Sequence, residues 1–354
     1  MKKTLFVPLV LMFAGVLGHA QGVPPFTITA ELQTGLRDVV SFAGSTVTDA
    51  VSLYDIDSGN PSRFRIGLGF TSLDSNWGIT TRLDSENLAG PSMGASWNQA
   101  LLWGKLFDGL VLLKTGLLDE TAFQLTWRHQ GTEVIWGAQF DGQVGAEIQV
   151  KPFAGLTVGA ILPIANGLGI LDLMSASNIA ATYSMPDFIK VSGGIQLAKA
   201  ANSAYAWIGA DWLAVPDLLA RFYAQATNIG DANLFWLQLY QEAAYPVQGF
   251  TINLRAWEEL YTLANSSIGW QLEPTVSYPI GIVTLALTGD IGTLLAADPH
   301  PGVASLPFGF GVGAYAEFAL APTSTIALGC YAGQPDVKIS AGTLQFYVNY
   351  RWSF

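Results

Sequence analysis

Charged side chains recur at every second position of short apolar segments in this chain. In one such segment Arg63 and Arg65 alternate with Phe64 and Ile66. Because successive side chains of a β-strand point to opposite faces, such a strand has one apolar and one charged face. A water-filled space lined by the charged faces would meet ions and polar solutes with both signs of charge. The residues predicted to line it are Glu31, Arg63, Arg65, Arg82, Arg128, Glu147, Lys151, Lys190, Asp211, Arg221, Arg255, Glu273, Glu317 and Arg351.

Few residues are candidates for catalysis. Two histidines, His129 and His300, are interpreted as solvated residues of a strand end and a loop. The neighbours Glu258 and Glu259 would face opposite ways on a strand, so they could not act together there. The sequence has no glycine-rich phosphate loop and no paired-histidine zinc motif. Its single cysteine, Cys330, excludes a disulfide within the chain. We therefore expect no enzyme, no cofactor and no metal site.

The composition is apolar and poor in charge. Of 354 residues, 50% are hydrophobic and 12% are charged, with a formal net charge of −11. A soluble domain has roughly 25% charged residues, and disorder requires low hydrophobicity. The acidic excess argues against nucleic acid, whose binders carry basic patches.

Residues 1–20 have the pattern of a secretory signal. Lys2 and Lys3 precede an apolar run over residues 5–17, and small residues flank a cleavage point before Gln21. The run is shorter than the roughly 20 residues that a membrane-spanning helix needs. We expect cleavage there and an exported mature chain of residues 21–354. Its net charge would be −13, since the charge of −11 loses two lysines.

The mature chain reads as strands rather than helices. Its best candidate for an apolar helix, residues 152–171, is interrupted by proline and glycine, which disfavour a helix interior. The alternating segments fit either a soluble β-sandwich or a transmembrane barrel with its apolar face toward lipid. Sparse charge and segments of about 9–12 residues favour the barrel. Aromatic residues near the predicted strand ends also favour it: Trp97, Trp103, Trp207, Trp212, Tyr278 and Trp352.

The C-terminal segment is the most specific of these patterns. From Leu344 to Phe354 the even positions are hydrophobic or aromatic, and most odd positions are polar. An amphipathic last strand that ends in an aromatic residue resembles the signal by which the barrel assembly machinery recognises bacterial outer-membrane proteins. By this resemblance, the assembly signal comprises Tyr350, Trp352 and Phe354.

Short connections with proline, glycine and aspartate set the strand count. They are predicted to be periplasmic turns, and the stretches between them extracellular loops. The turns lie near residues 73–75, 107–109, 152–155, 185–187, 215–217, 245–246, 278–281 and 321–323. The loops lie near residues 85–93, 164–174, 259–266, 292–305 and 332–340. This spacing predicts an antiparallel up-and-down barrel of about 18 strands, within a range of 16 to 20. Residues 37–61 are ambiguous, and residues 119–142 either constrict the lumen or add two strands.

The mature chain thus resembles porin-type outer-membrane β-barrels of bacteria. Two strand–turn–strand units, residues 103–109 and 150–159, look like those of spirochaete-type porin-like barrels. The resemblance implies that the protein lies in the bacterial outer membrane and contacts its lipid and the barrel assembly machinery. Porin-type barrels can also form homo-oligomers, and the sequence does not decide whether this chain does. Barrels of 16–18 strands leave an aqueous channel.

Passive diffusion of small hydrophilic solutes is therefore the leading function. Acidic residues assigned to loops would attract cations, which predicts a weak cation preference; they are Asp55, Asp57, Asp84, Glu86, Asp119, Glu120, Glu258, Glu259 and Asp298. The alternatives are a surface adhesin or antigen, or a transporter of hydrophobic substrates on the same barrel.

Overall fold

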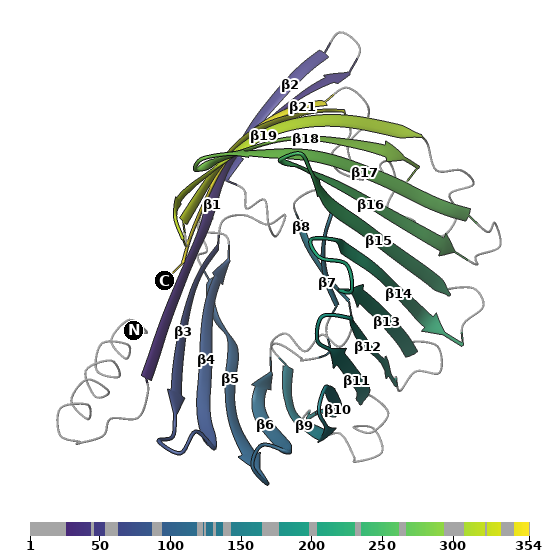
Figure 1. Ribbon diagram of the computed structural model, residues 1–354. Helices are drawn as coiled ribbons and strands as arrows, with labels where there is room; N and C mark the ends of the chain where they lie inside the picture. Colours follow the sequence, from purple (N-terminus) through teal and green to yellow (C-terminus); the bar gives the residue numbers. More distant parts are fainter. Residues whose placement is uncertain are drawn as a thin grey trace, which may run out of the picture.

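The computed structural model shows an antiparallel β-barrel (Figure 1). It describes residues 26–43, 46–53, 63–86, 94–118, 123, 125–129, 132–136, 143–164, 177–197, 204–230, 235–261, 267–293, 308–322, 324–333 and 343–353. No helix in these ranges is long and apolar enough to cross a membrane. The predicted signal at residues 1–20 lies outside them, as do His300 and Phe354.

Nineteen of the described strands form one sheet. They are β1 (Phe26–Ala43), β2 (Thr46–Leu53), β3 (Arg63–Thr71), β4 (Trp77–Glu86), β5 (Gly94–Leu106), β6 (Val111–Leu118), β9 (Gln143–Phe153), β10 (Leu156–Pro163), β11 (Asn178–Met185), β12 (Ile189–Gln196), β13 (Ala204–Trp212), β14 (Leu219–Ile229), β15 (Trp236–Val247), β16 (Phe250–Tyr261), β17 (Ser267–Ile280), β18 (Val283–Gly292), β19 (Gly309–Ala321), β20 (Ser324–Gly333) and β21 (Thr343–Ser353).

The first strand closes the barrel. Along one edge β1 pairs with β21, from Glu31↔Ser353 to Ser41↔Thr343. Its other edge is shared, because β3 pairs with residues 26–33 and β2 pairs with residues 36–43. Without β2, which extends the wall beyond β3, the closed ring has 18 strands, and the predicted number is confirmed. The ambiguous residues 37–43 and 46–53 thus belong to β1 and β2.

The predicted short turns all lie at one end of the barrel, here called the turn end. Each joins two consecutive antiparallel strands, as Phe107–Leu110 joins β5 to β6. There Asp108 and Gly109 have φ values of 54° and 85°, a left-handed conformation that aspartate and glycine tolerate best. One turn is displaced from its prediction: Pro246 lies within β15, and the chain reverses at Gln248 and Gly249. The opposite end is here called the loop end.

The outer face of the barrel is apolar. Exposed large hydrophobic residues alternate along the strands, as Val276 and Tyr278 do on β17 and Leu285 and Leu287 do on β18. The free Cys330 is exposed and shares the outward parity of Leu328, as the alternation predicts. Of the described aromatic residues proposed for a girdle, Trp97, Trp212 and Tyr278 are exposed. The prediction is wrong for Trp103 and Trp207, which pack inside the barrel.

Two further strands form a separate hairpin. β7 (Leu125–His129) and β8 (Thr132–Trp136) pair only with each other among the described residues. They lie inside the ring of strands (Figure 1), so they add no strand to the wall. Arg128, predicted to line the wall, belongs to this hairpin instead. The alternation in residues 125–129 matches that of the wall strands, and packing inside the barrel, described below, decides the placement.

Candidate functional site: the inner face of the barrel

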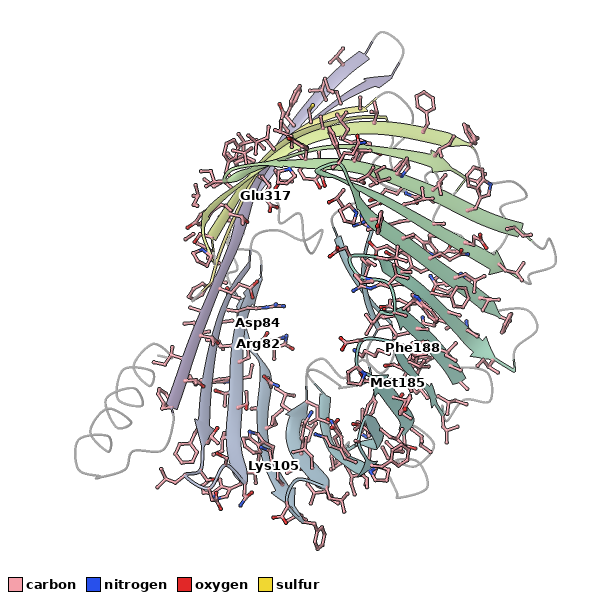
Figure 2. All side chains as sticks on the ribbon, viewed as in Figure 1. Arg82, Asp84, Lys105, Met185, Phe188 and Glu317 are labelled. Carbon is pink, nitrogen blue, oxygen red and sulfur yellow. The ribbon has the colours of Figure 1, made fainter. Side chains whose placement is uncertain are left out.

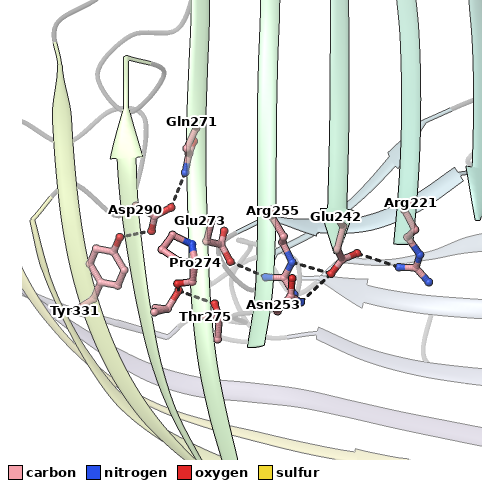
Figure 3. Close-up of polar contacts among 11 residues, drawn as sticks. Arg221, Glu242, Asn253, Arg255, Gln271, Glu273, Pro274, Thr275, Asp290 and Tyr331 are labelled. Carbon is pink, nitrogen blue, oxygen red and sulfur yellow. Dashed lines mark hydrogen bonds and ion pairs between the residues drawn. The ribbon is translucent and has the colours of Figure 1, made fainter. Parts of the chain in front are cut away.

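A row of alternating charges crosses five adjacent strands on the inner face. Figure 3 shows its members from Arg221 to Glu273. The register places each residue directly opposite the next: Asp211, Arg221, Glu242, Arg255 and Glu273, on β13 to β17. We call these five residues the charged row. Arg221 lies 3.2 Å from Asp211 and 3.4 Å from Glu242. Arg255 lies 3.1 Å from Glu242 through Nε and 2.6 Å from Glu273 through Nη1. Each arginine therefore bridges two carboxylates on the flanking strands.

Neutral polar groups complete the charged row. The Asn253 side-chain amide donates to Glu242 at 2.9 Å, and the Tyr223 hydroxyl donates to Asp211 at 2.7 Å. Beyond Glu273, the buried Asp290 of β18 accepts hydrogen bonds from Gln271 and from the Tyr331 hydroxyl (Figure 3). Hydrogen bonds and charge pairing together lower the cost of burying these carboxylates.

A second charged cluster lies on β1, β3 and β4. Asp84 accepts from Arg65 at 3.1 Å and from Arg82 at 3.0 Å, and Glu31 lies 3.6 Å from Arg65. Arg82 and Asp84 point toward the interior of the barrel (Figure 2). The amide of Asn98 donates to Asp84 at 2.8 Å. On the strands between the two clusters, Lys114 of β6 pairs with Glu147 of β9 at 3.0 Å.

The structure brings together most of the residues that parity predicted for the inner face. The ion pairs include Glu31, Arg65, Arg82, Glu147, Asp211, Arg221, Arg255 and Glu273. Lys151, Lys190 and Glu317 are exposed. Lys190 lies in register opposite Asp211, at the end of the charged row. For Arg63 and Arg351 only the backbone is described, within β3 and β21.

Four acidic residues assigned to loops lie in strands instead, two in β4 and two in β16. Asp84 is buried in β4, and Glu259 is buried in β16, where Gln238 donates to it at 2.8 Å. Glu258 is also in β16 and follows the opposite parity, as expected for strand neighbours. These strands continue past the residues where polar sequence suggested a loop. The remaining acids assigned to loops are undescribed, except for the backbone of Glu86 in β4.

Sequence reasoning also missed partners within the strands. Lys114, Glu242 and Asp290 lie on β6, β15 and β18, where no inner-face residue was predicted. The register places Lys114 opposite Glu147 and Glu242 opposite Arg255, so the alternation within each strand was the available signal. Among the residues that the structure describes, no three acidic, histidine or cysteine side chains are grouped as a metal site would require.

An apolar row lies two residues toward the loop end from the charged row. It comprises Gly209, Tyr223, Tyr240 and Trp257, again directly opposite one another on β13 to β16. The rings of Tyr223 and Tyr240 are 5.8 Å apart, and Tyr240 is 1% exposed. We call these four residues the apolar row.

Phe123, just before β7, and Leu125, the first residue of β7, cover part of this wall. Phe123 and Leu125, here called the anchors, are buried in one cluster with Trp207, Tyr223 and Tyr240. The indole Nε1 of Trp207 donates to the carbonyl oxygen of Phe123 at 3.1 Å. The β7–β8 hairpin is therefore held against the inner wall by apolar packing and this hydrogen bond.

A small cavity separates one anchor from the charged row. Its volume is about 190 Å³, and it is lined by Leu125, Lys190, Ser192, Gly209, Asp211, Arg221 and Tyr223. The cavity places polar and charged groups of the wall directly beside the hairpin. Charged and apolar surfaces thus meet at the base of the hairpin.

Comparison with known proteins identifies the architecture. No protein-family model matches the sequence, and no curated protein matches it. Among solved structures, OprD of Pseudomonas aeruginosa is 12% identical with a TM-score of 0.59, over 96% of each chain. A variant of OccD1 (OprD) is 12% identical with a TM-score of 0.61, over 96% of this chain and 97% of the other. A triple mutant of Rhodopseudomonas blastica porin is 14% identical with a TM-score of 0.54, over 93% of this chain and 100% of the other. The chain therefore has the β-barrel fold of bacterial outer-membrane porins.

Proposed function

We propose that this protein is an outer-membrane channel for passive diffusion of small hydrophilic solutes. One observation carries the proposal: a closed porin-fold barrel is apolar outside and lined inside by ion-paired charged residues. An apolar outer band suits lipid, and a polar lumen suits water. The similar structures include Rhodopseudomonas blastica porin, which supports the same function.

The export and assembly steps belong to the same proposal. Residues 1–20 would direct export and be cleaved, and the barrel assembly machinery would recognise Tyr350, Trp352 and Phe354 on the last strand. The resemblance to spirochaete-type barrels rests on two turn sequences and stays a prediction.

We further propose that the β7–β8 hairpin narrows the channel. The hairpin lies within the ring of strands and is anchored to its wall through Phe123 and Leu125. It therefore occupies cross-section that solutes would otherwise use. Deletion of residues 126–135 with a short linker should raise single-channel conductance. Unchanged conductance in a folded deletion variant would contradict a narrowing role.

Any ion preference should be weak and toward cations. The whole chain has 27 acidic and 16 basic residues, yet acids and bases alternate and pair along the inner wall. Paired charges of opposite sign largely cancel at a distance, so only the remaining excess would act on mobile ions. A reversal potential that indicates anion preference under a salt gradient would contradict this part.

The test is planar-bilayer recording of refolded protein that lacks residues 1–20. Discrete, reproducible conductance steps are expected without any added ligand. Arg82→Glu should shift the reversal potential toward cations, because this side chain points into the interior (Figure 2). Cys330→Ser, on the outer face, is the matched control and should leave the conductance and the reversal potential unchanged. Folded protein that never conducts would overturn the channel proposal and favour a surface-display or hydrophobic-substrate role.

A further inference from the structure

Two glycines of the barrel wall lie beneath the two anchors. Gly159 is on β10 beneath Phe123, and Gly209 is on β13 beneath Leu125. A Cβ atom added at Gly159 would lie 2.5 Å from Phe123 Cζ. One added at Gly209 would lie 2.5 Å from Tyr223 Cδ1 on the neighbouring wall strand β14 and 2.7 Å from Leu125 Cδ2. Carbon atoms in contact are normally about 3.5–4.0 Å apart, so neither position has room for a side chain with this hairpin in place.

A lack of space for a side chain, rather than an unusual backbone conformation, explains why glycine occupies both positions. Neither Gly159 nor Gly209 has a positive φ, so alanine would fit the extended backbone at either position. Alanine at Gly159 would meet the anchor Phe123 first, whereas alanine at Gly209 would meet both Tyr223 of the wall and the anchor Leu125. Phe123 is 0% exposed, so its ring has little room to turn away within the cluster, and the hydrogen bond from Trp207 holds its backbone carbonyl.

We propose that Gly159 and Gly209 are positioning residues that set how far the hairpin projects into the channel, and so the size of solute that passes. This inference rests on the proposed diffusion function. To reach normal contact distance from a methyl group at either glycine, an anchor has to shift by on the order of 1 Å. At Gly209 the ring of Tyr223 has to shift as well. The paired strands β7 and β8 would move together because a ladder of backbone contacts joins them.

The test compares three alanine variants in planar bilayers. Gly159→Ala and Gly209→Ala should each lower single-channel conductance, by roughly a factor of two, as the hairpin moves about 1 Å into the narrow part. The matched control is Gly69→Ala on β3. A Cβ at Gly69 would crowd the side chain of Thr27 on β1 and no part of the hairpin. The control should conduct like the unmodified protein. Equal conductance in all three variants would overturn the inference.

A double variant separates an effect through the anchor from a general distortion of the wall. In a Phe123→Ala background the ring that Gly159→Ala would displace is gone. Adding Gly159→Ala to this background should therefore cause no further change in conductance. If Gly159→Ala lowers conductance equally in both backgrounds, it acts through the wall and the inference fails.

A second readout keeps this inference separate from the proposed function. Arg128 lies in β7 and is a trypsin site within the hairpin. A displaced hairpin should be cleaved there faster in Gly159→Ala and Gly209→Ala than in the unmodified protein or Gly69→Ala. Protease rates can be measured even if no variant conducts, which would defeat only the channel proposal. Conducting variants cleaved at the control rate would defeat only the positioning role.

Discussion

The charged row and the apolar row lie side by side on the same strands and are stabilised in different ways. In the charged row every carboxylate and guanidinium contacts another member of the wall. In the apolar row Tyr223 and Tyr240 are buried partly by the anchors, which come from outside the wall. The charged row is thus complete within the barrel sheet, whereas the apolar row depends on a separate segment.

This difference shows that one barrel wall can hold some side chains in fixed pairs and also carry a hairpin whose position can change. The ion pairs of the charged row form only when neighbouring strands keep their register, and the register is set over the whole sheet. Packing of a separate hairpin can change without altering the register. Variants in the charged row should therefore affect the stability of the barrel, and variants at the anchors should affect mainly the lumen.

Removal of Arg255 should give the largest loss of stability. Arg255→Met leaves Glu242 and Glu273, each 5% exposed at the side chain, without their shared cation. Breaking a buried pair from one side costs about 3 kcal/mol or more. We expect this decrease in the free energy of unfolding, measured by urea titration in detergent. Lys190→Met, at the exposed end of the row, is the control. Equal losses for the two variants would contradict a special role for the buried bridge.

Truncation of a side chain in the apolar row should give the next largest loss of stability, and this loss should not depend on charge. Tyr240→Ala removes a ring that is almost fully buried, and such changes cost about 3 kcal/mol where the site cannot collapse. Because mostly packing rather than a full charge is lost, the decrease should be nearly the same at low and high salt. The same urea titration at two salt concentrations checks this. A strong salt dependence would show that the two rows are not separate.

The barrel itself could be predicted because its signals are local. Alternation identifies strands one at a time, and proline, glycine and aspartate mark turns such as the one at Asp108 and Gly109. Strand ends were harder to predict, since Asp84 and Glu259 are polar and still lie within strands. In a barrel with a polar interior, a polar residue that faces inward is compatible with a strand, so polarity alone does not mark the end of the strand.

The pairing on the inner face could be predicted only in part. Parity places Arg255 and Glu273 inside, but which acid meets which arginine depends on the offset between neighbouring strands. The offset between strands is set by the whole ring and cannot be predicted from the sequence of one segment. Similarly, Phe123 and Leu125 alternate like wall residues, and their contacts with distant Gly159 and Gly209 decide the placement of the hairpin.

Loss of one hydrogen bond to the hairpin should have a smaller effect. Trp207→Phe keeps most of the buried ring and removes the Nε1 donor to the Phe123 carbonyl. A single buried hydrogen bond contributes about 1 kcal/mol. We expect faster hydrogen exchange in residues 125–136 with little change in the unfolding of the barrel. Trp103→Phe, which packs against the same cluster, is the control. A global loss of stability would indicate that the hairpin and the wall unfold together.

The smallest effect is expected at a charge outside the wall. In the turn between β3 and β4, hydrogen bonds from Ser72 and from Asn76 lower the pKa of the fully exposed Asp74. A lowered pKa in the folded state stabilises the fold above the unfolded-state value of about 3.9, and this stabilisation is lost as the pH falls through the lower folded-state value.

Asp74→Asn keeps an acceptor oxygen in this turn and removes the charge. The unmodified protein should therefore be slightly more stable than the variant at neutral pH, and the difference should disappear in acid. Urea titrations of both proteins across this pH range measure it. Because Asp74 is solvated, its contribution should be far below that of Arg255, where two carboxylates share one cation away from water. A comparable loss at both positions would mean that water reaches the charged row freely and that burial contributes little to its strength.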